Sequence, residues 1–459
     1  MKNFESCYLV GLDLTAFKFP EDFSTKNFPE GQYLEVEKWK PEESLSELGR
    51  LANTAGIKVL GLDWQRREKP DQKTYVGLGK LLSISKTAIQ LNAQILLFDD
   101  ELTPAQIRAI ETNIDKKLRV IDRTALVLDI FARHATSHEG KIQVELAQLQ
   151  YRLPRLTRVW THLARQGGGR VGGSVGLRGP GEKQIEYDRR QIRRRIVVLS
   201  KRIERLGRQR NFGRNRQKKS GISKIAIVGY TNAGKSSLMK RLSDSKVVIA
   251  NKLFATLDST TKKVNLGEGY FALITDTVGF IQKLPHQLIA AFRGTLEEVV
   301  KADVLLLVFD GSDPNYLLHQ KAVERVLKDI GANKIPQIIV INKIDKIKGL
   351  INSEMLSQKA LPISAFKNFG IDLLRLRLKK KLISKNVRIE LFVPYSKSYL
   401  LGLLRSSGHV ENQEALSDGY HIVAYVSPYM SEKLRLQQFT DLSSLKEHDF
   451  EYSASNLKT

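Results

Sequence analysis

The chain has 459 residues, enough for about three domains of ~150 residues that each bury a core. Lysine and arginine number 74 against 49 aspartates and glutamates, which gives a formal net charge of +25. Because neutralising phosphates releases counterions, this excess favours nucleic acid as a partner over a merely solvated basic surface. Cys7 is the only cysteine, which excludes an intramolecular disulfide and disfavours a cysteine-based zinc site.

The sequence contains no membrane-spanning pattern, since no run of about 18 uncharged apolar residues occurs. The first residues, with Glu5 among short apolar pieces, do not resemble a signal peptide. We expect a cytoplasmic protein without membrane insertion, and peripheral membrane association stays open. Nothing in the sequence requires more than a monomer.

Short apolar runs alternate with helical patterns over residues 1–135. Because short joints link these runs, the pattern predicts a small parallel-sheet α/β subdomain. The stretch GLGK at 77–80 lacks the full spacing and the hydroxyl residue of a phosphate loop, so we expect no nucleotide chemistry there. The predicted strands are residues 8–12, 58–61, 95–98 and 119–122, and the predicted helices are 43–55, 82–91 and 103–114.

Residues 136–220 contain two apolar stripes with alternating spacings of four and three, which predict two helices packed antiparallel as a hairpin. Pro154 should bend or interrupt the first helix, because proline lacks the amide that an inner turn requires. Residues 208–220 show no apolar periodicity and are interpreted as a basic linker. The stripes are Ile142, Leu146, Leu149, Leu153, Leu156, Trp160 and Leu163, then Ile192, Ile196, Leu199, Ile203 and Leu206.

Between the stripes, residues 166–182 include eight glycines and predict a loop at the tip of the hairpin. Residues 189–220 then carry fourteen lysines or arginines against one acid, Glu204. A solvated charged face is the alternative, but the tip and the density of cations favour RNA binding. The expected RNA-binding residues are Arg165, Arg170, Arg178, Arg189, Arg190, Arg193 and Arg194.

One stretch, GYTNAGKS at residues 229–236, matches the phosphate-loop pattern G-x-x-x-x-G-K-[ST] in full. The apolar run at 225–228 predicts the strand before it, and residues 237–242 predict a helix after it. Glycines let the backbone close around phosphates, the lysine reaches the outer phosphates, and the serine ligates Mg²⁺. We expect nucleotide binding, with Lys235 also catalytic, by Gly229, Tyr230, Thr231, Asn232, Ala233, Gly234, Lys235 and Ser236.

Three further motifs follow predicted strands in the order found in GTP-binding domains. In D-x-x-G at 276–279, Asp276 approaches Mg²⁺ and the Gly279 amide senses the γ-phosphate, so both are candidate catalytic residues. In N-K-x-D at 342–345, Asp345 accepts from two guanine donors that adenine lacks, a discrimination on the order of 10⁴–10⁵. These motifs predict a doubly wound α/β domain over residues 221–385. The other expected GTP-binding residues are Thr277, Val278, Asn342, Lys343, Ile344, Ser364, Ala365 and Phe366.

The stretch KLFATLDSTT at 252–261 is the candidate first switch, where one threonine should ligate Mg²⁺ when GTP is bound; Thr256, Thr260 and Thr261 all stay open. Phe280 stands where many GTPases carry the glutamine that orients the attacking water. Because a phenyl ring cannot hydrogen-bond water, we expect slow intrinsic hydrolysis, with the missing group supplied by a macromolecular partner or a cation. Asn232 could hold a potassium ion, or it could simply stabilise the loop.

Residues 386–459 predict a small α+β domain without chemistry of its own, followed by a polar tail from about residue 440. The expected strands are 388–394 and 421–426, and the expected helix is 399–406.

Several long stretches outside the generic GTP motifs are specific to one family. The chain resembles the HflX family of ribosome-associated GTPases, in the Obg–HflX group of TRAFAC P-loop GTPases, over all but about its last thirty residues. The shared stretches are TYVGLGK (74–80), FDDELTPAQIR (98–108), VIDRTALVLDIFA (120–132), VELAQLQYRLPRL (144–156), RQGGG…RGPGE (165–182), FATLD (254–258), DTVGF (276–280) and LPHQLIAAFRGTLEE (284–298).

The resemblance implies an N-terminal α/β subdomain (1–135), a helical hairpin with a basic linker (136–220), a GTPase domain (221–385) and a small C-terminal domain (386–459). It implies hydrolysis of GTP to GDP and phosphate with Mg²⁺, at a slow rate that the ribosome stimulates. It also implies binding to the large (50S) ribosomal subunit and its rRNA, with the glycine-rich tip near the peptidyl-transferase centre, and GTP-dependent splitting of stalled or idle 70S ribosomes.

Matching FATLD makes Thr256 the preferred Mg²⁺ ligand and a candidate catalytic residue. The same match adds Phe254, Ala255, Leu257 and Asp258 to the expected GTP-binding residues. Two departures weaken the match: the glycine tip is longer than usual, and Ser259 replaces the usual proline.

Two other functions compete, namely a GTP-gated large-subunit assembly or anti-association factor without splitting activity, and an RNA-remodelling ATPase. The N-K-I-D motif disfavours the ATPase, although secondary ATP binding by the N-terminal part stays open.

Overall fold

The computed structural model describes residues 5–15, 39–156, 182–219, 222–243, 260–283, 293–347 and 360–436, which contain three β-sheets. They group into two units. The first contains the described residues up to Leu206 and the short segment Ile281–Lys283, and the second contains the other two sheets. Within these ranges no helix is long and apolar enough to cross a membrane. The expected boundaries between the four parts remain predictions.

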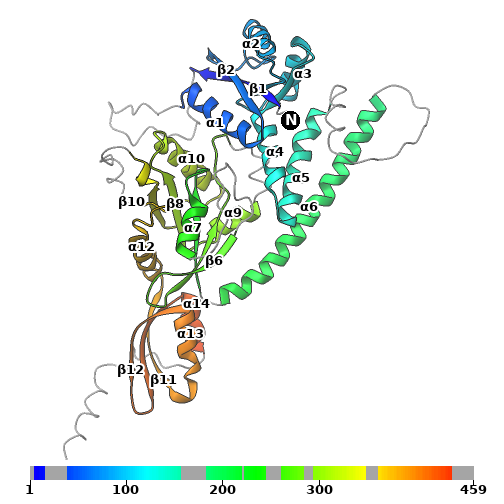
Figure 1. Ribbon diagram of the computed structural model, residues 1–459. Coiled ribbons are helices and arrows are strands. Elements are labelled where there is room, and N and C mark those ends of the chain that lie inside the picture. Colours follow the sequence, from blue (N-terminus) through cyan, green and yellow to red (C-terminus); the bar gives the residue numbers. More distant parts are fainter. Residues whose placement is uncertain are drawn as a thin grey trace, which may run out of the picture. The chain divides into compact units, whose positions relative to one another are not determined.

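The first sheet is fully parallel, with the strand order β2-β1-β3-β4, as the alternating pattern predicts (Figure 1). Successive residues of β1 face opposite sides. Val10 lies in the core that α2 and α3 complete, whereas Leu9 faces Gly49 of α1. The elements are β1 (Ser6–Leu14), α1 (Pro41–Thr54), β2 (Lys58–Arg67), α2 (Leu78–Gln90), β3 (Ile95–Phe98), α3 (Pro104–Asn113), β4 (Arg119–Asp122) and α4 (Arg123–His134).

The two predicted helices form an antiparallel pair, α5 (His138–Arg152) and the long α6 (Glu182–Lys219) (Figure 1). Leu199 is buried against Ile142 and Leu146, and Arg195 Nε lies 2.7 Å from Glu145 Oε1. Pro154 interrupts the first helix, as predicted. The helix α5 ends at Arg152, and Pro154 lies in a single 3-10 turn, η2 (Leu153–Arg155). Trp160 and Leu163 fall outside the described residues.

Residues 208–219, which the sequence suggested as a basic linker, continue the helix α6 to Lys219. Arginine, lysine and glutamine lose little rotamer freedom in a helix. A helix can therefore continue without an apolar stripe, and periodicity alone could not detect this one.

The second sheet has the order β10-β9-β8-β5-β7-β6 and is parallel except for the edge strand β6. β6 was not predicted because five of its six residues, TTKKVN, are exposed and only Val264 is buried. The elements are β5 (Ser223–Gly229), α7 (Lys235–Ser243), β6 (Thr260–Asn265), β7 (Phe271–Asp276), α9 (Arg293–Val300), β8 (Val304–Asp310), α10 (Tyr316–Asp329), β9 (Gln337–Asn342), η4 (Ile344–Lys346), β10 (Leu361–Pro362) and α12 (Ile371–Ile383).

The third sheet is antiparallel, with the order β11-β13-β12, and leucines of α13 and α14 and Met430 pack against strand residues such as Val426. Sequence periodicity missed β12 because its residues, GHVENQEA, are mostly polar and exposed. The elements are β11 (Val387–Pro394), η5 (Tyr395–Lys397), α13 (Tyr399–Ser407), β12 (Gly408–Ala415), β13 (Gly419–Val426) and α14 (Pro428–Leu436). The predicted polar tail lies outside the described residues.

The packing of α5 on α6 predicts unequal effects for two neighbouring substitutions. Leu199→Ala removes the central buried contact of the pair and should lower its local stability by about 2–4 kcal/mol. Val198→Ala, at a position 55% exposed, should change it by less than about 0.5 kcal/mol. Hydrogen exchange of the α5 and α6 amides measures both, and equal protection in the two variants would contradict this account of the packing.

Candidate nucleotide-binding site

The predicted nucleotide motifs gather at one edge of the second sheet. Residues 229–236 follow β5, residues 276–279 follow β7, residues 342–345 follow β9, and residues 364–366 come after β10. Because these strands are parallel, their carboxyl ends meet at the same edge, where open α/β sheets bind ligands.

The phosphate-loop residues enclose the ammonium group of Lys235. This side chain is buried, and its Nζ donates to the carbonyls of Gly229 (3.2 Å) and Tyr230 (2.8 Å). Burial lowers the pKa of Lys235 to about 8, against the opposing charge of Asp276 and with a smaller contribution from Lys343. Lys235 is therefore a poorly solvated cation that an anion would stabilise.

The loop requires glycine at both ends. A Cβ on Gly229 would lie 2.1 Å from the carbonyl oxygen of Val308 on the neighbouring strand β8. Gly234 has φ +92° and faces the amide of Asn342, so a side chain would be both strained and blocked. Asn232 also has positive φ, at 62°, and its side chain is exposed.

A hydroxyl and a carboxylate meet beside this lysine. Ser236 Oγ donates to Asp276 Oδ2 at 2.7 Å, and Asp276 is buried at the end of β7. Hard oxygen donors of this kind suit Mg²⁺. Among the described residues no group of three His, Cys, Asp or Glu side chains could hold a metal.

The candidate first switch is only partly described. Thr256 lies outside the described residues, as do Phe254, Ala255, Leu257 and Asp258. Thr260 and Thr261 belong to the exposed edge strand β6, where Thr261 Oγ1 lies 2.9 Å from Thr275 Oγ1.

The D-x-x-G motif runs against the phosphate loop. Phe280 N donates to Gly229 O (3.1 Å), Thr231 N donates to Phe280 O (2.8 Å), and Thr277 Oγ1 donates to Ile227 O (2.6 Å). A Cβ on Gly279 would lie 2.9 Å from both Thr231 Cα and Lys235 Nζ. Phe280 is 2% exposed and Val278 is also buried. Only glycine allows the motif to approach the loop this closely.

The N-K-x-D motif is hydrogen-bonded to the phosphate loop. Asn342 Nδ2 donates to Ala233 O (2.9 Å), and Lys343 Nζ donates to Asn232 O (2.7 Å). Lys343 has positive φ, 62°. The backbone amide of Ile344 donates to Ile363 O (3.3 Å). These bonds hold the two motifs in a fixed mutual position.

The last motif orients the carboxylate expected to recognise guanine. Ser364 Oγ donates to Asp345 Oδ1 at 2.6 Å. The backbone amide of Ala365 donates to Asn342 Oδ1 at 3.0 Å, so a guanine oxygen would have to share this donor. Phe366 is 78% exposed.

Sequence reasoning missed three side chains that support these motifs. Asp310 Oδ2 lies 2.7 Å from Lys343 Nζ. Arg241 of α7 donates to the carbonyls of Ala365 (2.8 Å) and Phe366 (2.9 Å), and His319 stacks on the Tyr230 ring with centroids 3.8 Å apart. Asp310 could have been found, since it ends a buried parallel strand, but no local signal marks Arg241 or His319.

Four of the expected RNA-binding residues lie on α6. Arg190, Arg193 and Arg194 are exposed, whereas Arg189 is half-buried and its guanidinium donates to Leu156 O at 3.3 Å. Arg193 is also 3.8 Å from Glu186. Arg165, Arg170 and Arg178 lie outside the described residues.

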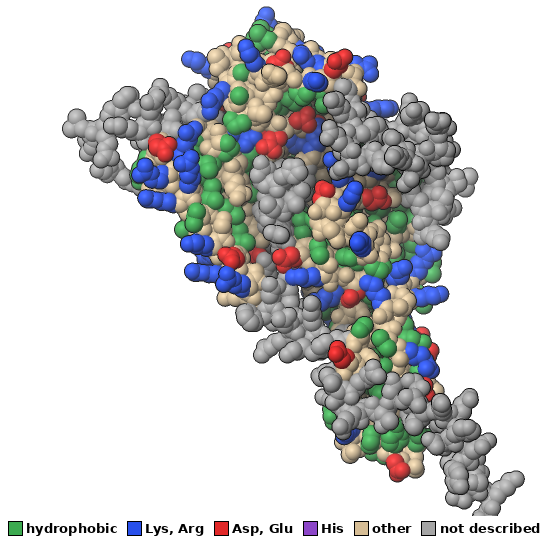
Figure 2. Space-filling view, turned by 180° about the vertical axis from the view of Figure 1, so that it is seen from behind, with side chains coloured by type: hydrophobic (Ala, Val, Ile, Leu, Met, Phe, Trp, Pro, Cys, Tyr) green, Lys and Arg blue, Asp and Glu red, His purple; other side chains and the backbone are tan. Residues whose placement is uncertain are grey.

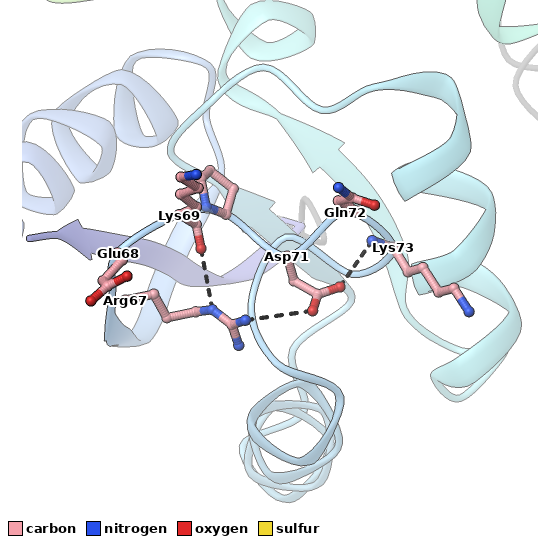
Figure 3. A pocket seen from close by; sticks show the side chains of 7 residues that line it. Arg67, Glu68, Lys69, Asp71, Gln72 and Lys73 are labelled. Carbon is pink, nitrogen blue, oxygen red and sulfur yellow. Dashed lines mark hydrogen bonds and ion pairs between the residues drawn. The ribbon is translucent and has the colours of Figure 1, made fainter. Parts of the chain in front are cut away.

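A separate hollow occurs in the first unit, at the loop that follows β2 (Figure 3). The described residues that line it run from Arg67, the last residue of β2, to Lys73. Arg67 pairs with Asp71 (3.6 Å), and Asp71 also accepts the Lys73 amide (2.9 Å). The hollow contains none of the nucleotide motifs.

Comparison with known proteins places the chain in a family. Residues 42–132 match the family model described as GTP-binding GTPase N-terminal, and residues 134–217 match the GTP-binding GTPase Middle Region. Residues 224–343 match the 50S ribosome-binding GTPase model. The GTPase HflX of Caldanaerobacter subterraneus subsp. tengcongensis is 42% identical over 394 residues, 86% of this chain and 90% of the relative. The chain belongs to the HflX family of GTPases.

A second relative, the enzyme of Escherichia coli, agrees with this membership. The GTPase HflX of Escherichia coli K12 is 45% identical over 309 residues, 67% of this chain and 71% of the relative. A solved GTP-binding protein from Sulfolobus solfataricus in complex with GDP is 25% identical, with 83% of this chain and 99% of that chain covered and a TM-score of 0.39. The sequence resemblance to the HflX family is therefore confirmed, and residues 224–343 match the GTPase domain of a 50S ribosome-binding family.

Asp345→Asn should weaken GTP binding on the order of 10³-fold, because two charge-assisted bonds to guanine are lost. The variant should instead prefer xanthosine triphosphate, whose base presents an oxygen in place of the exocyclic amine. Ser364→Ala is the matched control. It keeps the carboxylate and loses only the hydroxyl that orients it, so a loss of about tenfold is expected. Isothermal titration measures both, and unchanged GTP affinity in Asp345→Asn would refute the assignment.

The pKa of Lys235 predicts how nucleotide affinity depends on pH. In the free protein Lys235 loses its proton near pH 8, whereas bound phosphates would keep it charged. Binding above pH 8 must then take up a proton. Affinity for GTP should be flat below pH 8 and fall above it, approaching tenfold per pH unit. Titrations from pH 7 to 9 test this, and Lys235→Arg, whose charge persists, should abolish the decline.

Proposed function

We propose that this chain binds and hydrolyses GTP, associates with the large (50S) ribosomal subunit, and splits stalled or idle 70S ribosomes. The observation that carries the nucleotide part is the bonding between motifs, in which Asn342 and Lys343 both donate to carbonyls of the phosphate loop. The group that selects the base and the group that neutralises the phosphates are thus held at one sheet edge. The ribosomal part rests on the family and on the charge of the chain.

In the proposed complex, the amides of residues 229–236 and the start of α7 face the phosphates. Lys235 exchanges its two carbonyl acceptors for phosphate oxygens. Their negative charge stabilises the ammonium group, which burial has deprived of hydration. Asp345 accepts from the guanine edge while Ser364 holds its carboxylate in place. The Lys343 stem lies along the base, with Asp310 fixing its ammonium group.

The residues present fit a magnesium ion. Ser236 and, from the sequence, Thr256 would supply hydroxyl ligands, and Asp276 would act through a water. When bound, Mg²⁺ neutralises charge that develops on the phosphates. Potassium is a further candidate, with Asn232 near the phosphates as its ligand.

Intrinsic hydrolysis should be slow because the residue after Gly279, where many GTPases carry the water-orienting glutamine, has no side chain that can hydrogen-bond water. Phe280 occupies that position and is buried. The Gly279 amide can still sense the γ-phosphate, since its backbone lies directly on the phosphate loop. Binding to the ribosome would supply the missing group and raise the rate, as in GTPases that are completed by a partner.

The charge of the chain supports a ribosomal partner. The formal net charge is +25, and Figure 2 shows lysine and arginine side chains spread over the described surface on that side. On α6, Arg190, Arg193 and Arg194 are exposed. Such a surface gains affinity for rRNA by neutralising phosphates and releasing counterions.

The experiment that tests the proposal is sedimentation of purified 70S ribosomes with the protein and GTP, a non-hydrolysable analogue, or GDP. Conversion to subunits with GTP or the analogue, but not with GDP, is expected. A variant lacking residues 167–181 should bind GTP normally and leave 70S ribosomes intact. Co-migration with the large subunit without loss of 70S would instead favour the assembly or anti-association function. Splitting by the deletion variant would remove the tip from the mechanism.

A further inference from the structure

An exposed apolar surface follows the last nucleotide motif within the second unit. Phe366 is 78% exposed and Phe369 is 59% exposed, and both precede α12. The first two turns of that helix expose Leu373 (48%) and Leu376 (60%). Large apolar side chains gain free energy when they leave water, so a group of four exposed ones indicates a surface that contacts a partner. We call these four residues the α12 platform.

The loop that carries the two phenylalanines is held by hydrogen bonds. Ser364 N donates to Phe369 O (3.0 Å), and Phe369 N donates to Ser364 O (3.1 Å). Arg241 of α7 adds a second attachment, because it donates to the carbonyls of Ala365 and Phe366. A partner would therefore meet the two rings on a loop that is already fixed, and binding would cost little conformational entropy.

The charges beside these apolar side chains are mainly positive. Lys367 stands between the two phenylalanines, and Lys380 shares the face of α12 that carries the exposed leucines, four and seven residues before it. Both lysines are exposed, and neither side chain makes an ion pair within the part of the chain that the structure describes. The only acid in residues 366–384, Asp372, already pairs with Arg375 (3.4 Å). A fitting partner combines negative charge with flat apolar groups.

We propose that the α12 platform binds single-stranded RNA, with unpaired bases stacked on Phe366 and Phe369 and backbone phosphates beside Lys367 and Lys380. Every base has a face that can stack on an aromatic ring, and the cations supply affinity that does not depend on sequence. Duplex RNA does not fit, because its bases are stacked inside the helix. The net charge of +25 favours this polyanion over an acidic protein. The inference goes beyond the proposed function, since it requires neither GTP hydrolysis nor ribosome splitting.

The test measures, by fluorescence anisotropy, how the full chain binds a labelled single-stranded RNA of about 12 nucleotides. Phe369→Ala and Phe369→Leu should each weaken binding about tenfold, because leucine keeps an apolar side chain but removes the ring on which a base stacks. Tyr399→Ala is the matched control: this ring is 68% exposed on α13 of the same unit, and its loss should change affinity by less than about twofold. Lys367→Met should reduce the slope of log affinity against log salt by about 0.7.

Photo-cross-linking locates the contact independently of the arginines on α6. RNA that carries 5-iodouracil should form adducts at residues 366–369, which mass spectrometry identifies. Adducts confined to α6 would overturn the inference and leave the proposed RNA contact of that helix intact. Failure of the wild-type chain to bind the RNA would overturn it whether or not ribosomes are split.

Two affinity results would also contradict the inference. Binding by Phe369→Ala within about twofold of wild type would show that the ring contributes no stacking. Weak binding by Phe369→Ala together with wild-type binding by Phe369→Leu would show that the surface needs apolar volume rather than an aromatic face. An acidic amphipathic protein segment would then be the better occupant.

Discussion

The site depends on the central position of β5, which pairs in parallel with β7 on one side and β8 on the other. A strand enclosed in this way can deliver its loop only at its carboxyl end, and Gly229 leaves that strand where no Cβ would fit. Lys235 is buried behind this loop, and the loss of hydration there lowers its pKa. Phosphate recognition thus follows from backbone geometry first and from side-chain charge second.

The other motifs take their positions from this loop. Asn342 bonds to Ala233 and Ala365, while Ser364 holds Asp345. A chain of single hydrogen bonds therefore joins the phosphate end of the site to the base end. Each link is short and buried or half-buried, where a hydrogen bond is stronger than in water. The site consequently behaves as one network rather than four separate motifs.

The sequence predicted those parts of the fold whose signals are local. The strands Ile95–Phe98 and Arg119–Asp122 were located to the residue, because a bounded apolar run marks the first and a short apolar pair between charged residues marks the second. β6 and β12 were missed because edge strands need no apolar alternation, and the end of α6 was missed because a charged helix carries no stripe. The motif residues were predictable from spacing. The supports Arg241 and His319 were not, because their contacts join distant parts of the chain.

One consequence of α7 concerns length rather than chemistry. The helix begins at Lys235 beside the phosphate loop, and six residues later Arg241 donates to the carbonyls of Ala365 and Phe366. At ~1.5 Å per residue this interval is about 9 Å, so the helix sets the spacing between the phosphate loop and residues 365–366. Adding one residue inside it would turn Arg241 by about 100° away from its acceptors. A substitution along α7 therefore preserves this spacing, whereas an insertion or deletion would destroy it.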